Sequence, residues 1–156
     1  MWRQSLIGQV GNPTGDQAEK KKGRILILDQ DDCTCDFLSS IIKLIGFECE
    51  MVKNVEQAVE QLEKSAFDLL ITDLRLPNSQ QFLEASLEKH PHLQTIIMVH
   101  RRQVFYEALR LPGAAFIQKP FNFDDIVEKI HQAIHHRSLQ QVETQIQRLR
   151  HEIFRF

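Results

Sequence analysis

The sequence predicts an α/β fold built on a doubly wound, five-stranded parallel sheet. Three observations support this prediction. Short apolar runs of strand length recur along the chain, amphipathic stretches of helix length separate them, and strand and helix alternate five times from residue 24 onwards. Continuous apolar strands are typical of a sheet that is buried on both faces, and their alternation with helices is typical of parallel pairing.

The first two strands flank a well-marked helix. Residues 25–28 (ILIL) are apolar at every position and form the first predicted strand. Residues 34–45 carry their apolar side chains on one face, which predicts a helix that stops at Gly46. Residues 47–52 alternate in polarity, as expected of an edge strand.

The middle of the chain repeats this pattern. Residues 55–64 have helical apolar spacing, and residues 67–72 (FDLLIT) form the third predicted strand. Ser79 is expected to cap the next helix, because a serine hydroxyl can accept a hydrogen bond from a free helical N–H. Residues 94–99 (QTIIMV) form the fourth strand.

The last strand and helices complete five strand–helix units. A helix is predicted over residues 103–111, a short strand over residues 114–118, and a final helix from Asp124. Right-handed crossovers between parallel strands then favour the flavodoxin-like (βα)5 arrangement.

The final helix is predicted to extend beyond the sheet. The chain therefore divides into a flexible N-terminal tail (1–23), a folded domain (24–137) and a C-terminal helix (138–156) that is a candidate coiled coil. The alternative is that its apolar stripe packs back on the same domain. The stripe has spacings of 3, 4, 3, 4 and 3 residues and consists of Leu139, Val142, Ile146, Leu149, Ile153 and Phe156.

The composition is that of an ordinary globular protein. The 156 residues are 42% hydrophobic, and a formal net charge of −2 gives no bulk attraction to nucleic acid or to an anionic membrane. No apolar run approaches the ~18 residues that span a bilayer, and no secretory signal is evident. An odd count of three cysteines predicts reduced thiols in a cytoplasmic protein.

Charged side chains follow three of the predicted strands. Asp29 follows the first strand, Asp73 the third and Lys119 the fifth. The carboxyl ends of parallel strands meet at one edge of a sheet, so two carboxylates and an ammonium are expected to converge there. Several histidines could suggest a metal site, but solvated side chains explain them better; they are His90, His92, His100, His131, His135 and His136.

Three stretches resemble the response-regulator receiver family. They are RILILDQDD at 24–32, FDLLITDLRLP at 67–77 and GAAFIQKPF at 113–121, and the resemblance covers about residues 24–137. It implies that Asp73 accepts a phosphoryl group from a histidine kinase or a phosphotransfer protein. It also implies that Asp29, Asp73 and the backbone carbonyl of Arg75 hold Mg²⁺. It further implies that Lys119 contacts the phosphoryl oxygens, and that a cis bond between Lys119 and Pro120 orients the lysine toward them.

The chain departs from the family pattern at several site positions. Gln30 replaces the second acid after the first strand, so Mg²⁺ is expected to bind weakly there, because an amide oxygen brings no charge. Val99 replaces the hydroxyl residue after the fourth strand, and Phe116 takes the aromatic switch position. Asp31 or Asp32 could stand in for the missing acid, although both suit a helix N-terminus better.

Three functions remain open from the sequence. The first is a phosphorylatable receiver that signals through protein–protein contacts, and the second is a pseudo-receiver that dimerises or docks without phosphate. The third is a small α/β enzyme that uses Asp73, but no P-loop, GxSxG or HExxH motif accompanies it, so no enzyme is predicted. A homodimer through the C-terminal helix is expected, without direct binding to nucleic acid or membrane.

Overall fold

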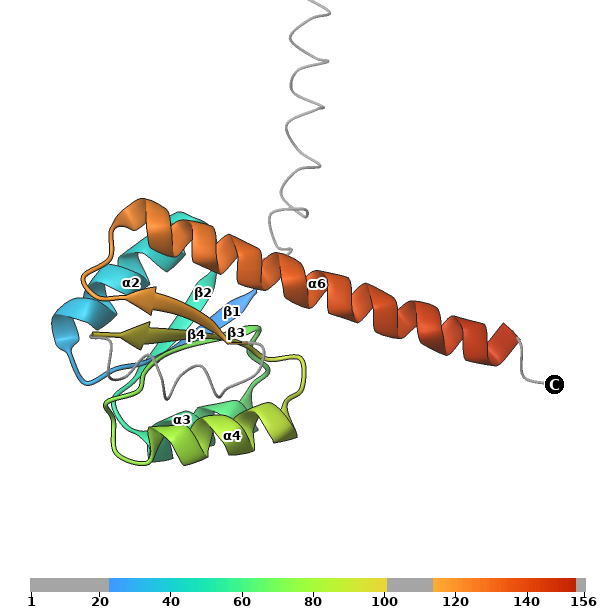
Figure 1. Ribbon diagram of the computed structural model, residues 1–156, viewed down its shortest axis with the longest axis horizontal. Helices are drawn as coiled ribbons and strands as arrows, with labels where there is room; N and C mark the ends of the chain where they lie inside the picture. Colours follow the sequence, from blue (N-terminus) through green and yellow to red (C-terminus); the bar gives the residue numbers. More distant parts are fainter. Residues whose placement is uncertain (1–22, 101–113, 154–156) are drawn as a thin grey trace, which may run out of the picture.

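The computed structural model describes residues 23–100 and 114–153. These residues form one parallel sheet with strand order β2-β1-β3-β4-β5, which confirms the predicted flavodoxin-like fold (Figure 1). The elements are β1 (Arg24–Leu28), α2 (Asp32–Leu44), β2 (Glu48–Val52), α3 (Val55–Lys64), β3 (Leu69–Asp73), α4 (Ser79–Lys89), β4 (Gln94–Val99), β5 (Ala115–Gln118) and α6 (Phe123–Ile153). The helix predicted over residues 103–111 and the tail up to residue 22 lie outside the described residues.

The sheet is covered on both faces, as its continuous apolar strands predict (Figure 1). Ile25 and Ile27 of β1 pack in a cluster with α2 and α6, whereas Leu26 and Leu28 pack in a second cluster with α3 and α4. Successive side chains of a strand point to opposite faces, so a strand that serves both clusters must be apolar throughout.

The N-terminus of α2 is capped by a local side chain, whereas the N-terminus of α4 differs from the prediction. Asp31 caps α2 by accepting hydrogen bonds from the backbone N–H of Thr34 at 3.3 Å and from its hydroxyl at 2.6 Å. The expectation that Ser79 caps α4 is wrong: the cap residue is Asn78, in the left-handed region with φ of 62°. The Ser79 hydroxyl instead donates to the carbonyl of Leu74 at 2.7 Å, because the chain turns back on itself before the helix.

Helix α6 is one continuous helix of 31 residues that extends beyond the sheet (Figure 1). Its first half is buried through Ile126, Ile130 and Ala133. In its second half the apolar stripe is exposed, with exposed fractions of 44% for Ile146 and 63% for Ile153. In this single chain the described part of the stripe therefore does not pack back on the domain.

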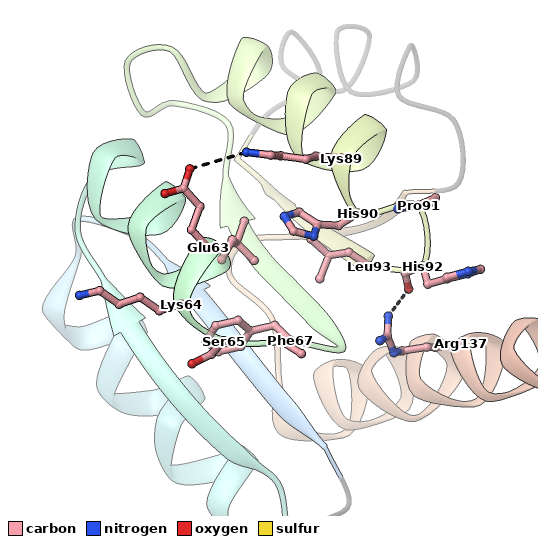
Figure 2. Close-up of a pocket in the computed structure, with 12 residues that line it drawn as sticks. Glu63, Lys64, Ser65, Phe67, Lys89, His90, Pro91, His92, Leu93 and Arg137 are labelled. Carbon is pink, nitrogen blue, oxygen red and sulfur yellow. Dashed lines mark hydrogen bonds and ion pairs between the residues drawn. The ribbon is translucent and has the colours of Figure 1, made fainter.

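Arg137 attaches α6 to the sheet at the amino-terminal ends of β3 and β4, opposite the strand ends that carry Asp29 and Asp73. Its Nε lies 2.6 Å from Asp68 Oδ1. One of its terminal nitrogens donates to the His92 carbonyl at 2.5 Å (Figure 2). One turn further on, Gln140 accepts a hydrogen bond from Gln94 at 3.1 Å. These contacts fix the direction in which the helix leaves the domain. No described helix is both long and apolar enough to cross a membrane.

Candidate functional site

The ends of strands β1, β3 and β5 bring Asp29, Asp73 and Lys119 together. The Lys119 ammonium nitrogen lies 2.6 Å from Asp29 Oδ2 and 3.1 Å from Asp73 Oδ2. The expected convergence of these three side chains is confirmed, and so is the expected cis bond between Lys119 and Pro120. The roles assigned to the residues stay predictions.

The three charges are largely removed from water. Asp29 and Asp73 are each 2% exposed, and the Lys119 side chain is 10% exposed. Two buried carboxylates side by side repel each other strongly unless a cation lies between them. Lys119 supplies that cation, and a further backbone N–H, from Asp31, donates to Asp29 Oδ1 at 2.9 Å.

Asp73 is held in its ionised form. Burial raises the pKa of this carboxyl, but hydrogen bonds from the Arg75 side chain and backbone and the charge of Lys119 outweigh burial and lower the pKa to about 2. A carboxylate that is ionised throughout the neutral range and lies at a strand end can act as a nucleophile.

The guanidinium of Arg75 is a contact that the sequence analysis missed. Only its backbone carbonyl was expected at the site. The structure shows that its Nη2 donates to Asp73 Oδ2 at 2.9 Å, its Nε lies 3.2 Å from the same oxygen, and its backbone N–H donates to Oδ1 at 2.8 Å. The side chain is 53% exposed, so it covers the carboxylate from the solvent side. Its position two residues after a strand-end aspartate was the available signal.

His100 is a second missed contact. It directly follows Val99 at the end of β4, and its Nε2 lies 3.4 Å from Asp73 Oδ2. From the sequence, His100 was expected to be a solvated side chain like the other histidines. The informative signal was its place after the fourth parallel strand, at the edge where β1, β3 and β5 also end.

The remaining predicted residues lie around this centre. Gln30 is exposed beside Asp29. Val99 is the last residue of β4 and is 4% exposed. Its side chain is a hydrocarbon, so it offers the site no hydrogen-bond donor. Phe116 in β5 is half-buried against the cluster that includes α3 and α4.

The oxygen atoms at this centre are of the kind that a hard divalent cation prefers. Asp29 and Asp73 are bridged by one ammonium group, so both carboxylates reach a common point, and carboxylate and carbonyl oxygens suit Mg²⁺. Asp31, the candidate substitute for Gln30, is engaged in capping α2. In the described part of the chain no group of three or more His, Cys, Asp or Glu side chains is placed to hold a metal.

Two cavities differ in their relation to this centre. One of about 470 Å³ lies at the opposite end of the sheet, between α3, α4 and Arg137 (Figure 2). Another of about 420 Å³ includes His100 and Lys119 in its lining, together with Phe37 of α2. The second cavity is therefore lined by two residues, His100 and Lys119, whose side chains lie next to Asp73.

Comparison with known proteins agrees with the geometry. Residues 25–131 match the family model described as the response regulator receiver domain. The transcriptional regulatory protein ZraR of Escherichia coli O157:H7 is 26% identical over 77% of this chain and 28% of its own length. The response regulator protein FleR of Pseudomonas aeruginosa is 30% identical over 63% of this chain and 22% of its own. The chain thus spans about a quarter of the length of these relatives.

Solved structures support the same fold. A CheY-like response regulator receiver domain protein from Methanospirillum hungatei JF-1 matches with a TM-score of 0.69 and 27% identity, over 76% of this chain and 98% of that one. NtrX from Brucella abortus, in complex with ADP, matches with a TM-score of 0.75 and 21% identity over 80% of this chain and 29% of its own. The chain belongs to the response regulator receiver domain family, the signalling modules of two-component systems.

Proposed function

We propose that this receiver accepts a phosphoryl group on Asp73 from a histidine kinase or a phosphotransfer protein and passes the signal on by protein–protein contacts. The observation that carries the proposal is the Lys119 ammonium group, which lies within hydrogen-bond distance of both buried carboxylates, Asp29 and Asp73. A lysine and a strand-end carboxylate in this arrangement suit the transfer of an anionic group.

The chemistry begins with an ionised nucleophile. With a pKa of about 2, Asp73 presents a carboxylate oxygen at neutral pH. This oxygen attacks the phosphorus of a donor phosphohistidine; the new O–P bond forms as the P–N bond breaks, and the donor imidazole leaves with the bonding electron pair. The product is an aspartyl phosphate with the donor histidine restored.

Cationic side chains then exchange one partner for another. The Arg75 guanidinium and the Lys119 ammonium both contact Asp73 Oδ2 before the reaction. When Asp73 becomes an acyl phosphate, these groups lose a charged carboxylate acceptor and gain phosphoryl oxygens nearby. When bound, Mg²⁺ offsets negative charge on the transferred group; Asp29, Asp73 and the Arg75 carbonyl would hold it, with Gln30 as a weaker, uncharged oxygen donor.

The output is proposed to run through a homodimer. One side of α6 carries five apolar side chains that are each 44–63% exposed: Leu139, Val142, Ile146, Leu149 and Ile153. Their heptad spacing suits pairing with the same stripe of a second copy, and such an exposed stripe on a helix favours association. Because α6 also packs on the sheet through its first half, a change at the site can alter how two such helices pair.

A reducing, cytoplasmic setting is proposed for the protein. It is in keeping with the free cysteines Cys33, Cys35 and Cys49.

A small phosphodonor tests the proposal directly. The full chain is incubated with acetyl phosphate and Mg²⁺, and the intact mass is measured. We expect an increase equal to one phosphoryl group that is lost on treatment with hydroxylamine, as for an acyl phosphate, and that is absent in Asp73→Asn. A chain that stays unmodified would contradict phosphoryl acceptance and would leave a phosphate-independent docking module as the better description.

A further inference from the structure

The end of β4 offers the site an imidazole where a hydroxyl is missing. Val99 closes the strand with a buried side chain that has no hydrogen-bond donor. The next residue, His100, has its Nε2 3.4 Å from Asp73 Oδ2. The Nε2 atom is itself buried, and within residues 23–100 and 114–153 it has no hydrogen-bond partner. A buried polar atom without a partner is rare enough to require an explanation.

The position of Nε2 suits an acceptor that extends beyond the carboxylate. At 3.4 Å the imidazole Nε2 contacts Asp73 Oδ2 but does not form a hydrogen bond with it. A phosphoryl group on that oxygen places three strong acceptor oxygens outside the carboxylate. A neutral imidazole with its proton on Nε2 can donate to one of them.

The other cations near Asp73 have different positions. The Lys119 ammonium lies on the inner side, shared with Asp29. The Arg75 guanidinium is paired with both oxygens of the unmodified carboxylate from the solvent side. Of the described donors near Asp73, His100 is the one whose nitrogen makes no hydrogen bond before the reaction, so a phosphoryl group can accept one from it without breaking an existing hydrogen bond.

We infer that His100 donates a hydrogen bond from Nε2 to the phosphoryl group on Asp73 and thereby replaces the hydroxyl that Val99 cannot supply. The inference rests on the proposed function and assigns one more phosphoryl-binding residue to its site. A hydrogen bond to an anionic group of this kind is strong enough to affect binding of the group measurably.

Beryllofluoride, which mimics the phosphoryl group on an aspartate, provides the test. Its affinity for the full chain with saturating Mg²⁺ is measured by ¹⁹F NMR for the unaltered protein, His100→Ala, His100→Gln, Val99→Thr and the double variant Val99→Thr/His100→Ala. We expect His100→Ala to weaken binding about tenfold, as for loss of one charge-assisted hydrogen bond. His100→Gln, which keeps a donor near the position of Nε2, should recover most of that loss.

The double variant separates phosphoryl contact from mere support of the fold. If the hydroxyl and the imidazole serve the same acceptor, His100→Ala should weaken binding only about twofold once Val99→Thr is present, because the two effects are then not additive. The same loss in both backgrounds, or no loss in either, overturns the inference. Thermal unfolding of each variant without ligand checks that the fold is kept.

Failure of the proposed function has a different result. If the unaltered chain binds no beryllofluoride, and Asp73→Asn behaves identically, phosphoryl acceptance is overturned and this inference falls with it. If the unaltered chain binds, Asp73→Asn does not, and His100→Ala binds as tightly as the unaltered chain, the inference alone is overturned.

Discussion

The Lys119 ammonium nitrogen lies 2.6 Å from Asp29 Oδ2, and both side chains are almost entirely buried. The same nitrogen also reaches Asp73, so a single cation neutralises two carboxylates that come from different strands. The geometry gives the lysine a structural task in addition to its proposed contact with a phosphoryl group. The two tasks can be separated, because only the first operates without phosphate.

Replacing this lysine should therefore destabilise the protein before any reaction takes place. Lys119→Met leaves two buried carboxylates without their shared cation, and loss of one partner from a buried charge group costs about 3 kcal/mol. Urea unfolding without Mg²⁺ measures the change, and added Mg²⁺ should restore part of the stability because it can replace the lost charge. Lys43→Met, at an exposed position of α2, is the control and should change stability by less than about 0.5 kcal/mol.

The ionisation of Asp73 leads to a prediction about acid stability. Its folded-state pKa of about 2 lies below the value of about 3.9 for an unfolded aspartate. The carboxylate therefore stabilises the fold fully above the unfolded pKa, and this contribution is lost as the pH falls through about 2. A ¹³C NMR titration of the carboxyl carbon should show Asp73 still ionised well below pH 3.9, where an unfolded aspartate is half protonated.

Arg75 should be the main side chain that holds this pKa down. Its hydrogen bonds lower the pKa of Asp73 more than the charge of Lys119 does. Arg75→Ala should therefore raise the pKa in the same titration, whereas Arg148→Ala, at an exposed position of α6, should leave it unchanged. An unaltered pKa in Arg75→Ala would mean that the guanidinium does not rest on Asp73 in solution.

The sequence predicted the centre of the site better than its rim. Asp29, Asp73 and Lys119 were predictable because strand ends of a parallel sheet share one edge, and strand ends can be recognised from apolar runs. The Arg75 side chain and His100 were not, because their contribution depends on where a side chain turns after the backbone has left the strand. The prediction that Ser79 caps α4 failed for the same reason, because the Ser79 hydroxyl donates to the Leu74 carbonyl in the preceding turn.

Gln30 limits the affinity for Mg²⁺ in our proposal, and Gln30→Asp should relieve the limit. The residue directly follows Asp29 at the end of β1. A carboxylate there adds a third charged side chain to a proposed metal site that has two, Asp29 and Asp73. We expect Mg²⁺ to bind about tenfold more tightly, equivalent to ~1.4 kcal/mol, by isothermal titration calorimetry. Gln132→Asp adds the same charge on α6 and should not change the affinity. Equal affinity in Gln30→Asp and the unaltered chain would place residue 30 outside the metal site.

The exposed stripe of α6 predicts self-association of the full chain. Ile146 and Leu149 lie at its centre with exposed fractions of 44% and 56%, and pairing with a second copy buries them at roughly 25 cal/mol per Å². A seam of this length is short, so we expect a dissociation constant on the order of 10 μM, or about −7 kcal/mol. Sedimentation equilibrium at about ten times that concentration should therefore report mostly dimer.

Charge on the stripe should abolish the dimer, because an aspartate at a paired apolar position would have to be buried without a partner. Ile146→Asp/Leu149→Asp should sediment as a monomer with an unchanged thermal unfolding midpoint for the domain. Gln147→Asp is the matched control: it lies on the same exposed segment of α6 but outside the stripe, and it should remain dimeric. A full chain that is monomeric under these conditions would refute pairing through α6, and the output of the receiver would then have to use another surface.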